Sequence, residues 1–516
     1  LEVICCDHLG PEFQNMDING YDISYDATEI VFSGRLEGDP NYGIFVLDIA
    51  SGEVEQLPTD PTKHYIYPIF MPGDLVMFNT TAVVEEGAPQ FRDEYERGNT
   101  TQLGTIRRDG GGETLFARNL SHMVHGDVMY DGRVVVTQWD HLAGMNSGHL
   151  LSVNPDGTVR QEAFGQEGTG VTNSYYKAVE VQPGRLVAIG SSRDRTIQSG
   201  TILDIKLGLD DGAGGFTKDM SDANASYQIL TPGVPLGRED SSATIGRYYS
   251  AYPLNTEGKP DLLVTWADGP VQSETLAAAG LSAQFGIYLY DADKNQRKPI
   301  YDDPDLWDLF PRPLVAREAP PVIAPQDANP EAGDGVLIGS MNVYESSLDT
   351  FEDGSIYGVR VIEGFSVEEG IPNDFGITRH EGAAVLGTAV VQPDGSWMAR
   401  IPANVPVHLQ TIDQFGMSLR SEPIWITGNA GEARVCGGCH ESRTETTVIN
   451  PGITEALALG AADLMSTVPR YDGSGNSLRV SSNLAITSAL DDVSNITELV
   501  GVPWGGEGGG GDVALQ

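Results

Sequence analysis

The stretch HGDVMYDGRVVVTQWDHL, residues 125–142, contains the pattern on which the fold prediction rests. Its turn signal, Tyr130-Asp131-Gly132, leads directly into the short apolar run Val134–Thr137. Asp and Gly favour tight turns, and a short run rich in β-branched residues is typical of a buried strand. The stretch therefore predicts a turn followed by a buried β-strand.

This unit recurs along the chain. Apolar runs of strand length begin at Ile30, Leu75, Val134, Leu186, Leu262 and Val336, at spacings of 45, 59, 52, 76 and 74 positions. Each of the first five runs is followed by a second apolar stretch with its own polar turn. A buried strand, an outer hairpin and a turn, repeated at this spacing, are typical of propeller blades. The sequence thus predicts a six-bladed β-propeller over residues 20–365, after an N-terminal segment at 1–19.

The remaining residues differ from the repeats. Short alternating strands around the turn Pro393-Asp394-Gly395 predict a small antiparallel β-sandwich at 366–430. A helix is expected at 453–468, because Ile453, Leu457, Leu464 and Val468 fall on one helical face before Pro469. It belongs to a segment at 431–504, and the Gly-rich residues 505–516 resemble a flexible linker beyond which the natural chain is expected to continue. The predicted fold class is mainly β.

The composition excludes several classes of protein. The 516 residues include 31 Lys+Arg and 73 Asp+Glu, for a net charge of −42. This charge argues against nucleic acid as a partner, because phosphate binding needs clustered basic residues. It fits either a saline habitat or a basic protein partner. No apolar run approaches the 18 residues of a transmembrane segment.

The strongest chemical motif is Cys436-Gly437-Gly438-Cys439-His440, the CxxCH pattern of covalent haem c attachment. Two cysteines at this spacing reach the two vinyl groups of one porphyrin edge, and His440 then ligates the iron. A zinc site would need a second CxxC or Cys/His pair at matching spacing. A thioredoxin-type pair would follow a strand in a βαβ unit. The motif therefore predicts one covalent haem, with Cys436, Cys439 and His440 as its binding residues.

The sixth iron ligand stays open at the level of the sequence. A Met ligand would raise the reduction potential of the haem. A filled sixth position would favour an electron carrier, and an open one would favour a catalyst. The candidates are Met465, His122, His125, His141, His149, His380 and His408. Cys5 and Cys6 remain open as a vicinal disulfide, a further cofactor attachment or two buried thiols.

Two segments resemble known families. Phrases such as DISYDATEIVFS and FGIYLYDADKNQRKPIYDDPD resemble TolB-like (WD40-like) propellers of exported bacterial proteins. The run from Pro393 through the CxxCH motif to Glu441 resembles proteins related to the hydrazine synthase alpha subunit. The resemblance implies an exported haem c protein and transfers Cys436, Cys439 and His440 motif to motif. It does not carry over hydrazine synthesis, because that enzyme is a multihaem complex of several subunits.

Three functions follow as hypotheses. The first is an extracytoplasmic c-type cytochrome that transfers electrons to a partner with a basic docking face, within a larger assembly. The second is a haem enzyme acting on a small nitrogen or sulfur compound. The third is a propeller binding module with a structural haem. Covalent haem attachment implies a periplasmic or cell-surface location.

Overall fold

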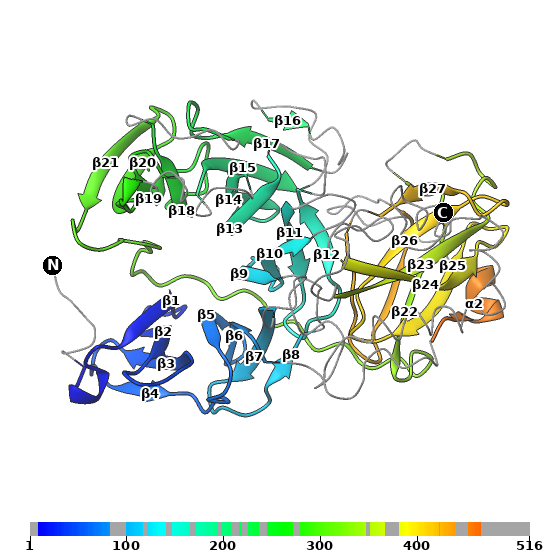
Figure 1. Ribbon diagram of the computed structural model, residues 1–516, viewed down its shortest axis with the longest axis horizontal. Coiled ribbons are helices and arrows are strands. Elements are labelled where there is room, and N and C mark those ends of the chain that lie inside the picture. Colours follow the sequence, from blue (N-terminus) through cyan, green and yellow to red (C-terminus); the bar gives the residue numbers. More distant parts are fainter. Residues whose placement is uncertain are drawn as a thin grey trace.

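The computed structural model describes residues 9–82, 100–116, 122–140, 147–165, 172–192, 199–207, 216–218, 225–236, 245–271, 279–346, 351–366, 381–422, 424–439 and 452–465. These residues form two β-regions, a ring of sheets and a sandwich, which lie side by side (Figure 1). The mainly β fold with propeller, sandwich and one short helix agrees with the prediction.

Within the described residues the ring contains five antiparallel meanders, numbered here as blades 1 to 5. Blade 1 consists of β1 (Asp17–Ile23), β2 (Glu29–Arg35), β3 (Gly43–Asp48) and β4 (Val54–Gln56), after a 3-10 turn at Pro11–Phe13. Blade 2 consists of β5 (Tyr65–Met71), β6 (Leu75–Thr80), β7 (Gln102–Arg107) and β8 (Thr114–Leu115). Blade 3 consists of β9 (Met123–Val128), β10 (Val134–Asp140), β11 (Ser147–Val153) and β12 (Gln161–Phe164).

Blade 4 consists of β13 (Ser174–Gln182), β14 (Arg185–Ser191), β15 (Thr201–Leu207) and β17 (Ala225–Ile229), with the two-residue β16 (Thr217–Lys218) beside β17. Blade 5 consists of β18 (Arg247–Pro253), β19 (Leu262–Ala267), β20 (Gly286–Asp291) and β21 (Gln296–Tyr301). Blades 3 and 4 are linked by a single parallel pair, Gly148 and Ser174.

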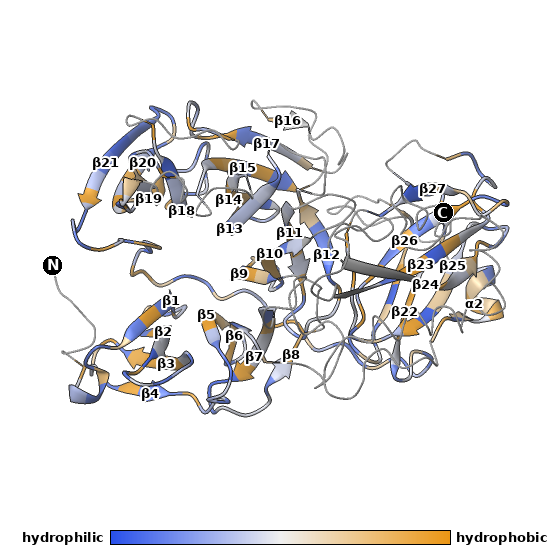
Figure 2. Cartoon of the chain, viewed as in Figure 1, coloured by the Kyte–Doolittle hydropathy of each residue, from blue (hydrophilic) through white to orange (hydrophobic). Residues whose placement is uncertain are grey.

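The second strand of each blade is the apolar run found in the sequence. Each of these strands has a valine that is fully buried; these are Val31, Val76, Val135, Val187 and Val264. Apolar clusters fill the spaces between neighbouring blades, for example between blades 4 and 5 around Val187, Tyr248 and Val264. Figure 2 shows these apolar stretches alternating with polar outer strands. Burial between blades explains why the second strands read as continuous apolar runs.

The sandwich contains two four-stranded sheets. One has the order β28-β22-β25-β29 and the other β24-β23-β26-β27. Their bounds are β22 (Gly335–Ser340), β23 (Gly358–Ser366), β24 (Glu381–Val390), β25 (Trp397–Pro402), β26 (Val407–Ile412), β27 (Ser418–Ser421), β28 (Ala433–Cys436) and β29 (Ala462–Asp463). Val336, Val361 and Val407 are among the buried residues of their shared core.

Two predicted elements need correction. The run Val336–Ile338, predicted as the buried strand of a sixth blade, lies in β22 of the sandwich, so the sandwich begins near Gly335 rather than at residue 366. A turn followed by a short apolar strand looks the same in both architectures. The helix predicted at 453–468 is the short α2 (Glu455–Leu459). Gly460, at φ 85°, ends it, and β29 then pairs with β25.

Residues 302–334, the connecting segment, join blade 5 to the sandwich without regular strands. Figure 1 shows the segment crossing the ring between blades 5 and 1 and continuing to the sandwich. The Tyr21 hydroxyl donates to the Phe310 carbonyl at 2.7 Å, and the Arg312 guanidinium lies 5.0 Å from the Tyr252 ring centroid. The connecting segment therefore bridges blade 1 and blade 5.

Blade 3 carries the contact with the sandwich. The Gln138 side chain donates to the Trp425 carbonyl at 3.1 Å, and the Arg160 guanidinium donates to the Thr427 hydroxyl at 2.6 Å. The Val159 amide donates to the buried Glu432 carboxylate at 2.9 Å. These polar contacts fix the orientation of the two regions. In the part of the chain that the structure describes, no helix has the length and apolar character that spanning a membrane requires.

Candidate functional site

The CxxC part of the motif lies at the end of a strand on the edge of the sandwich. Cys436 is the last residue of β28, is exposed, and pairs with Ser340 of β22; Cys439 is half-buried. The backbone between them is fixed by three hydrogen bonds to the chain after β22: Met341 and Asn342 amides donate to the carbonyls of Cys436 and Gly437, and the Cys439 amide donates to Glu345. A short, backbone-anchored loop thus holds Cys436 at the surface and Cys439 against the edge of the sandwich core.

Of the two glycines in the motif, Gly438 is required by the close approach of the loop to Glu345. A Cβ added to this residue would lie 2.0 Å from the Glu345 carbonyl oxygen, far inside van der Waals contact. The loop therefore packs its backbone directly on the backbone of Glu345. A side chain at position 438 would displace the loop and separate the two cysteines from their positions.

Among the described candidates for the sixth ligand, Met465 does not lie at this loop. Met465 packs at the other end of β22, where its sulfur would lie 2.8 Å from a Cβ added to Gly335. Gly335 and Ser340 are five residues apart on an extended strand, which corresponds to about 17 Å. Met465 is therefore remote from Cys436 in this structure. His440, His141, His380, Cys5 and Cys6 lie outside the described residues.

The histidines in and beside blade 3 have separate environments. His122 bonds through Nδ1 to the Thr101 hydroxyl at 2.6 Å and stacks on Trp139. His149 is buried and bonds through Nδ1 to the Glu162 carboxylate at 2.9 Å. His125 faces the centre of the ring. Among the described residues, no three His, Cys, Asp or Glu side chains are grouped as a metal site would require.

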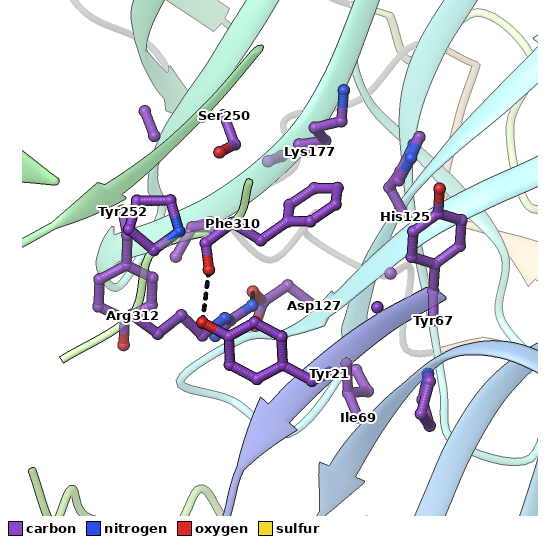
Figure 3. Close-up of a pocket in the computed structure, with 17 residues that line it drawn as sticks. Tyr21, Tyr67, Ile69, His125, Asp127, Lys177, Ser250, Tyr252, Phe310 and Arg312 are labelled. Atoms are coloured by element: carbon purple, nitrogen blue, oxygen red, sulfur yellow. Dashed lines mark hydrogen bonds and ion pairs between the residues drawn. The ribbon is translucent and has the colours of Figure 1, made fainter. Parts of the chain in front are cut away.

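A second candidate site is the cavity at the centre of the ring (Figure 3). The innermost strand of every blade contributes to its lining: β1, β5, β9, β13 and β18. The connecting segment contributes Phe310, Pro311 and Arg312. The cavity measures about 600 Å³, including the part that is open to solvent. All five blades and the connecting segment therefore form the cavity together.

Arg312 holds two carboxylates at one side of this cavity. Its guanidinium lies 2.8 Å from Asp127 and 3.3 Å from Asp22, whose side chain is almost completely buried. Arg317 adds a contact of 3.4 Å to Asp22. Although burial opposes a charge on Arg312, the carboxylates of Asp127 and Asp22 raise the pKa of the guanidinium. This cluster joins blades 1 and 3 to the connecting segment.

The fold and the CxxC loop define a class of protein in which a β-propeller is joined to a β-sandwich that presents two cysteines at its edge. Residues 353–441 match the family model of the hydrazine synthase alpha subunit middle domain. The match covers β23 to β28 and includes all three residues of the CxxCH motif.

Two relatives extend this match. Hydrazine synthase subunit alpha from Kuenenia stuttgartiensis is 23% identical over 266 residues, which cover 42% of this chain and 29% of the relative. The solved structure of Kuenenia stuttgartiensis hydrazine synthase superposes with a TM-score of 0.65 at 16% identity, covering 87% of this chain and 66% of that chain. TolB from Acinetobacter baumannii is also similar, at 11% identity and a TM-score of 0.34, over 55% of this chain and 54% of that chain.

The predicted relationship to the hydrazine synthase alpha subunit is confirmed. The aligned part of this chain spans less than a third of the curated relative. The fold relationship covers the propeller and the sandwich together, whereas the family model covers the sandwich and its cysteine loop.

The central cavity was not predicted from the sequence. Its residues Tyr67, His125 and Lys177 precede the turn glycines Gly73, Gly132 and Gly184 by 6, 7 and 7 positions. All three have left-handed backbone angles, with φ of 50°, 57° and 54°. This recurring distance to a turn glycine is the signal that would have placed the three residues at equivalent points of successive blades.

Proposed function

We propose that this chain is an extracytoplasmic haem c protein that transfers electrons within a larger redox assembly. One haem is attached through Cys436 and Cys439, with His440 as the axial ligand. The observation that carries the proposal is the placement of an exposed Cys436 and a half-buried Cys439 on one backbone-anchored loop, within the stretch that matches the hydrazine synthase alpha middle domain.

The protein's own residues contribute two things to this function. The loop between Cys436 and Cys439 is fixed on Met341, Asn342 and Glu345, which keeps the attachment points in place. The net charge of −42 gives the surface a negative field that attracts a basic redox partner. When bound, haem supplies a one-electron couple whose potential depends on its ligands and burial.

Attachment is tested with the full chain, exported and produced together with a haem c maturation system. Haem staining after denaturation is expected to detect covalent haem in the natural sequence and none in a Cys436→Ala, Cys439→Ala variant. A Cys5→Ala, Cys6→Ala variant is the matched control and is expected to keep its haem. Covalent haem in the first variant, or none in the natural protein under these conditions, would refute the proposal.

Electron transfer is tested on the matured protein by optical spectra of the reduced form, with and without carbon monoxide. An electron carrier is expected to give a six-coordinate, low-spin spectrum that carbon monoxide leaves unchanged. Association with a basic cytochrome is expected to weaken as salt rises, because surface charges are screened. A salt-independent association would contradict a role for the acidic surface.

A haem enzyme acting on a small nitrogen or sulfur compound is the second candidate. The extended structural match to hydrazine synthase supports it, since that match covers 87% of this chain. It requires an open iron position, so carbon monoxide should shift the spectrum of the reduced protein promptly. The same spectrum therefore separates the two candidates. Periplasmic or cell-surface residence belongs to both, because covalent haem attachment takes place outside the cytoplasm.

A further inference from the structure

The central cavity of the ring has a repeated construction. In β1, β5, β9 and β13 the pairing with the next strand slips by one residue, between Ile18 and Tyr21, Ile66 and Ile69, Val124 and Asp127, and Tyr176 and Val179. A bulge of this kind redirects side chains and is over-represented beside functional sites. The extra residue therefore lies at an equivalent position in the innermost strand of four successive blades.

Three of these bulges place a polar side chain in left-handed backbone geometry. The residues are Tyr67, His125 and Lys177, and each lines the cavity. A left-handed conformation costs roughly 1 kcal/mol or more for residues other than glycine, and it persists only where the surrounding structure holds it. Figure 3 shows the three side chains extending towards the same end of the cavity.

His125 is the group that points to a ligand. Its side chain is 9% exposed, and neither ring nitrogen has a hydrogen-bond partner among the described residues. A buried imidazole without partners is costly, because its nitrogens lose their hydrogen bonds to water. His125 is one of the residues that line the cavity, and a small rotation of the ring would turn a nitrogen towards a bound molecule.

Lys177 provides a second basic group at the same place. It is 7% exposed, and its Nζ lies 3.5 Å from the centroid of the Tyr249 ring. Burial lowers the pKa of Lys177 well below its usual value. Burial, with a further contribution from the Lys177 charge, does the same to the pKa of His125. Both groups therefore gain if a negative charge enters the cavity.

The other charged groups around the cavity pair among themselves. Arg312 from the connecting segment contacts Asp127 of β9 and Asp22 of β1. The Ser250 hydroxyl of β18 donates to Thr265. Tyr67 lies beside His125 and Tyr249 beside Lys177, and both phenols are neutral because burial raises their pKa. Arg312 therefore holds the carboxylates of Asp22 and Asp127 on the connecting-segment side of the cavity.

Aromatic rings form the walls beside this pair. The Tyr67 ring centroid lies 4.8 Å from that of His125 and 6.1 Å from that of Phe310. The Phe310 ring lies 5.6 Å from Tyr249. A flat apolar body fits against such rings, whereas a hydrated inorganic anion gains nothing from them.

We propose that the central cavity binds a small organic carboxylate, with its carboxylate at His125 and Lys177 and its apolar body against Tyr67 and Phe310. The site is separate from the cysteine loop and does not depend on haem. Binding is accompanied by proton uptake, because a nearby carboxylate favours the charged forms of both basic groups.

The test uses benzoate as the probe and isothermal titration of the full chain at pH 6.0. Benzoate is expected to bind at least tenfold more tightly than benzyl alcohol, which has the ring without the charge, and than acetate, which has the charge without the ring. Equal affinity for benzyl alcohol, or no detectable benzoate binding at millimolar concentration, would overturn the proposal.

Two substitutions probe the basic pair. His125→Asn, which tolerates the left-handed backbone, and Lys177→Met are each expected to weaken benzoate binding about tenfold or more. His64→Gln and Lys294→Met are the matched controls; they lie outside the cavity and are expected to leave the affinity unchanged. Cavity variants that keep their unfolding temperature and bind benzoate normally would refute the assigned roles.

A measurement on the unchanged protein covers the case in which the variants fail to fold. Titrations in MES and in Bis-Tris, which differ in protonation enthalpy, are expected to give different apparent binding enthalpies, reporting proton uptake. Identical enthalpies would contradict the proton uptake that the proposal assigns to His125 and Lys177. The Cys436→Ala, Cys439→Ala variant is expected to bind benzoate unchanged, so failure of the haem proposal and failure of this one are distinguishable.

Discussion

His125 in the propeller and His408 in the sandwich are both buried, and for both of them neither ring nitrogen has a hydrogen-bond partner among the described residues. His408 lies on β26, and its ring meets the fully buried Trp425 edge-on at 5.1 Å between centroids. It packs inside the sandwich. His125 instead borders a cavity together with Lys177 and the Arg312 cluster.

The difference shows that burial of an imidazole does not by itself define a site. In the sandwich, the histidine fills space beside a large aromatic ring, close to the contact with blade 3 that the Trp425 carbonyl makes. In the propeller, strands from every blade converge on an open volume and bring basic, acidic and aromatic groups to it. Burial lowers the pKa of both imidazoles, and His125 in addition lines a cavity in which a ligand could contact it.

The largest expected effect concerns the charges of the propeller. Arg312→Met removes the cation shared by Asp22 and Asp127 and should destabilise the protein by about 3–5 kcal/mol, since a buried ion pair that loses one partner leaves an uncompensated charge. Urea unfolding followed by tryptophan fluorescence measures this loss. A change below about 1 kcal/mol would show that the cluster does not hold the ring together.

The second prediction concerns His408 and acid stability. Burial lowers the pKa of His408 to about 3, while the unfolded chain has a value near 6.5. Between these values the unfolded state binds a proton that the folded state does not, so stability should fall by about 1.4 kcal/mol per pH unit as the pH drops below about 6.5. Above that pH the residue contributes no pH dependence.

His408→Leu should remove this contribution and flatten the acid side of the stability profile. Urea midpoints of both proteins at pH 7.5, 5.5 and 4.5 provide the measurement, and the carboxylates common to both cancel in the difference. Parallel profiles would mean that His408 binds a proton in the folded protein as readily as in the unfolded chain. His408 would then not be a neutral side chain that only fills space in the sandwich.

A smaller effect is expected at the cysteine loop. Gly438→Ala introduces a Cβ against the Glu345 backbone and should cost about 1 kcal/mol of stability while lowering covalent haem content severalfold. Haem staining per mole of protein gives the second quantity. Gly416→Ala, on the β26–β27 turn at φ 76°, adds backbone strain far from the cysteine loop and should leave the haem content unchanged, which separates a general loss of stability from the contact with Glu345. Unchanged haem content would indicate that the loop accommodates the side chain.

The smallest effect is expected for an ion pair on the same strand as Asp22. Arg35 contacts Asp17 of β1 at 2.6 Å, and both side chains are largely exposed. Arg35→Met should cost about 0–1 kcal/mol, because solvent screens the pair. Unfolding under the conditions used for Arg312→Met makes the comparison direct. A similar loss for both variants would contradict the special role of burial in the central cluster.

Much of the fold could be predicted because each blade buries its second strand. Runs such as Val134–Thr137 consist of β-branched residues that are all buried, and the turns before them are explicit in the sequence. The same local pattern misassigned Val336–Ile338, because a strand pattern states that a segment is buried without stating which sheet it joins. The helix prediction overlooked Gly460, where the left-handed φ ends α2.

The two candidate sites also differ in how far the sequence could predict them. The cysteine loop is contiguous in sequence, so a five-residue motif was sufficient to find it. The cavity gathers Tyr67, His125, Lys177 and Phe310 from four distant segments, and closure of the ring brings them together. His125 was singled out from the sequence as a haem ligand candidate, and the structure places it in the ring centre instead, away from the cysteine loop on the sandwich.

The connecting segment also determines how this protein can be divided. Because Arg312 and Arg317 lie beyond the last propeller strand, a fragment ending at Tyr301 would contain all five blades and yet lose both arginines that contact Asp22. The edge between blades 1 and 5 would lose Phe310 at the same time. The propeller is therefore not a transferable module: any truncation, fusion or domain exchange should keep the chain intact to the start of the sandwich.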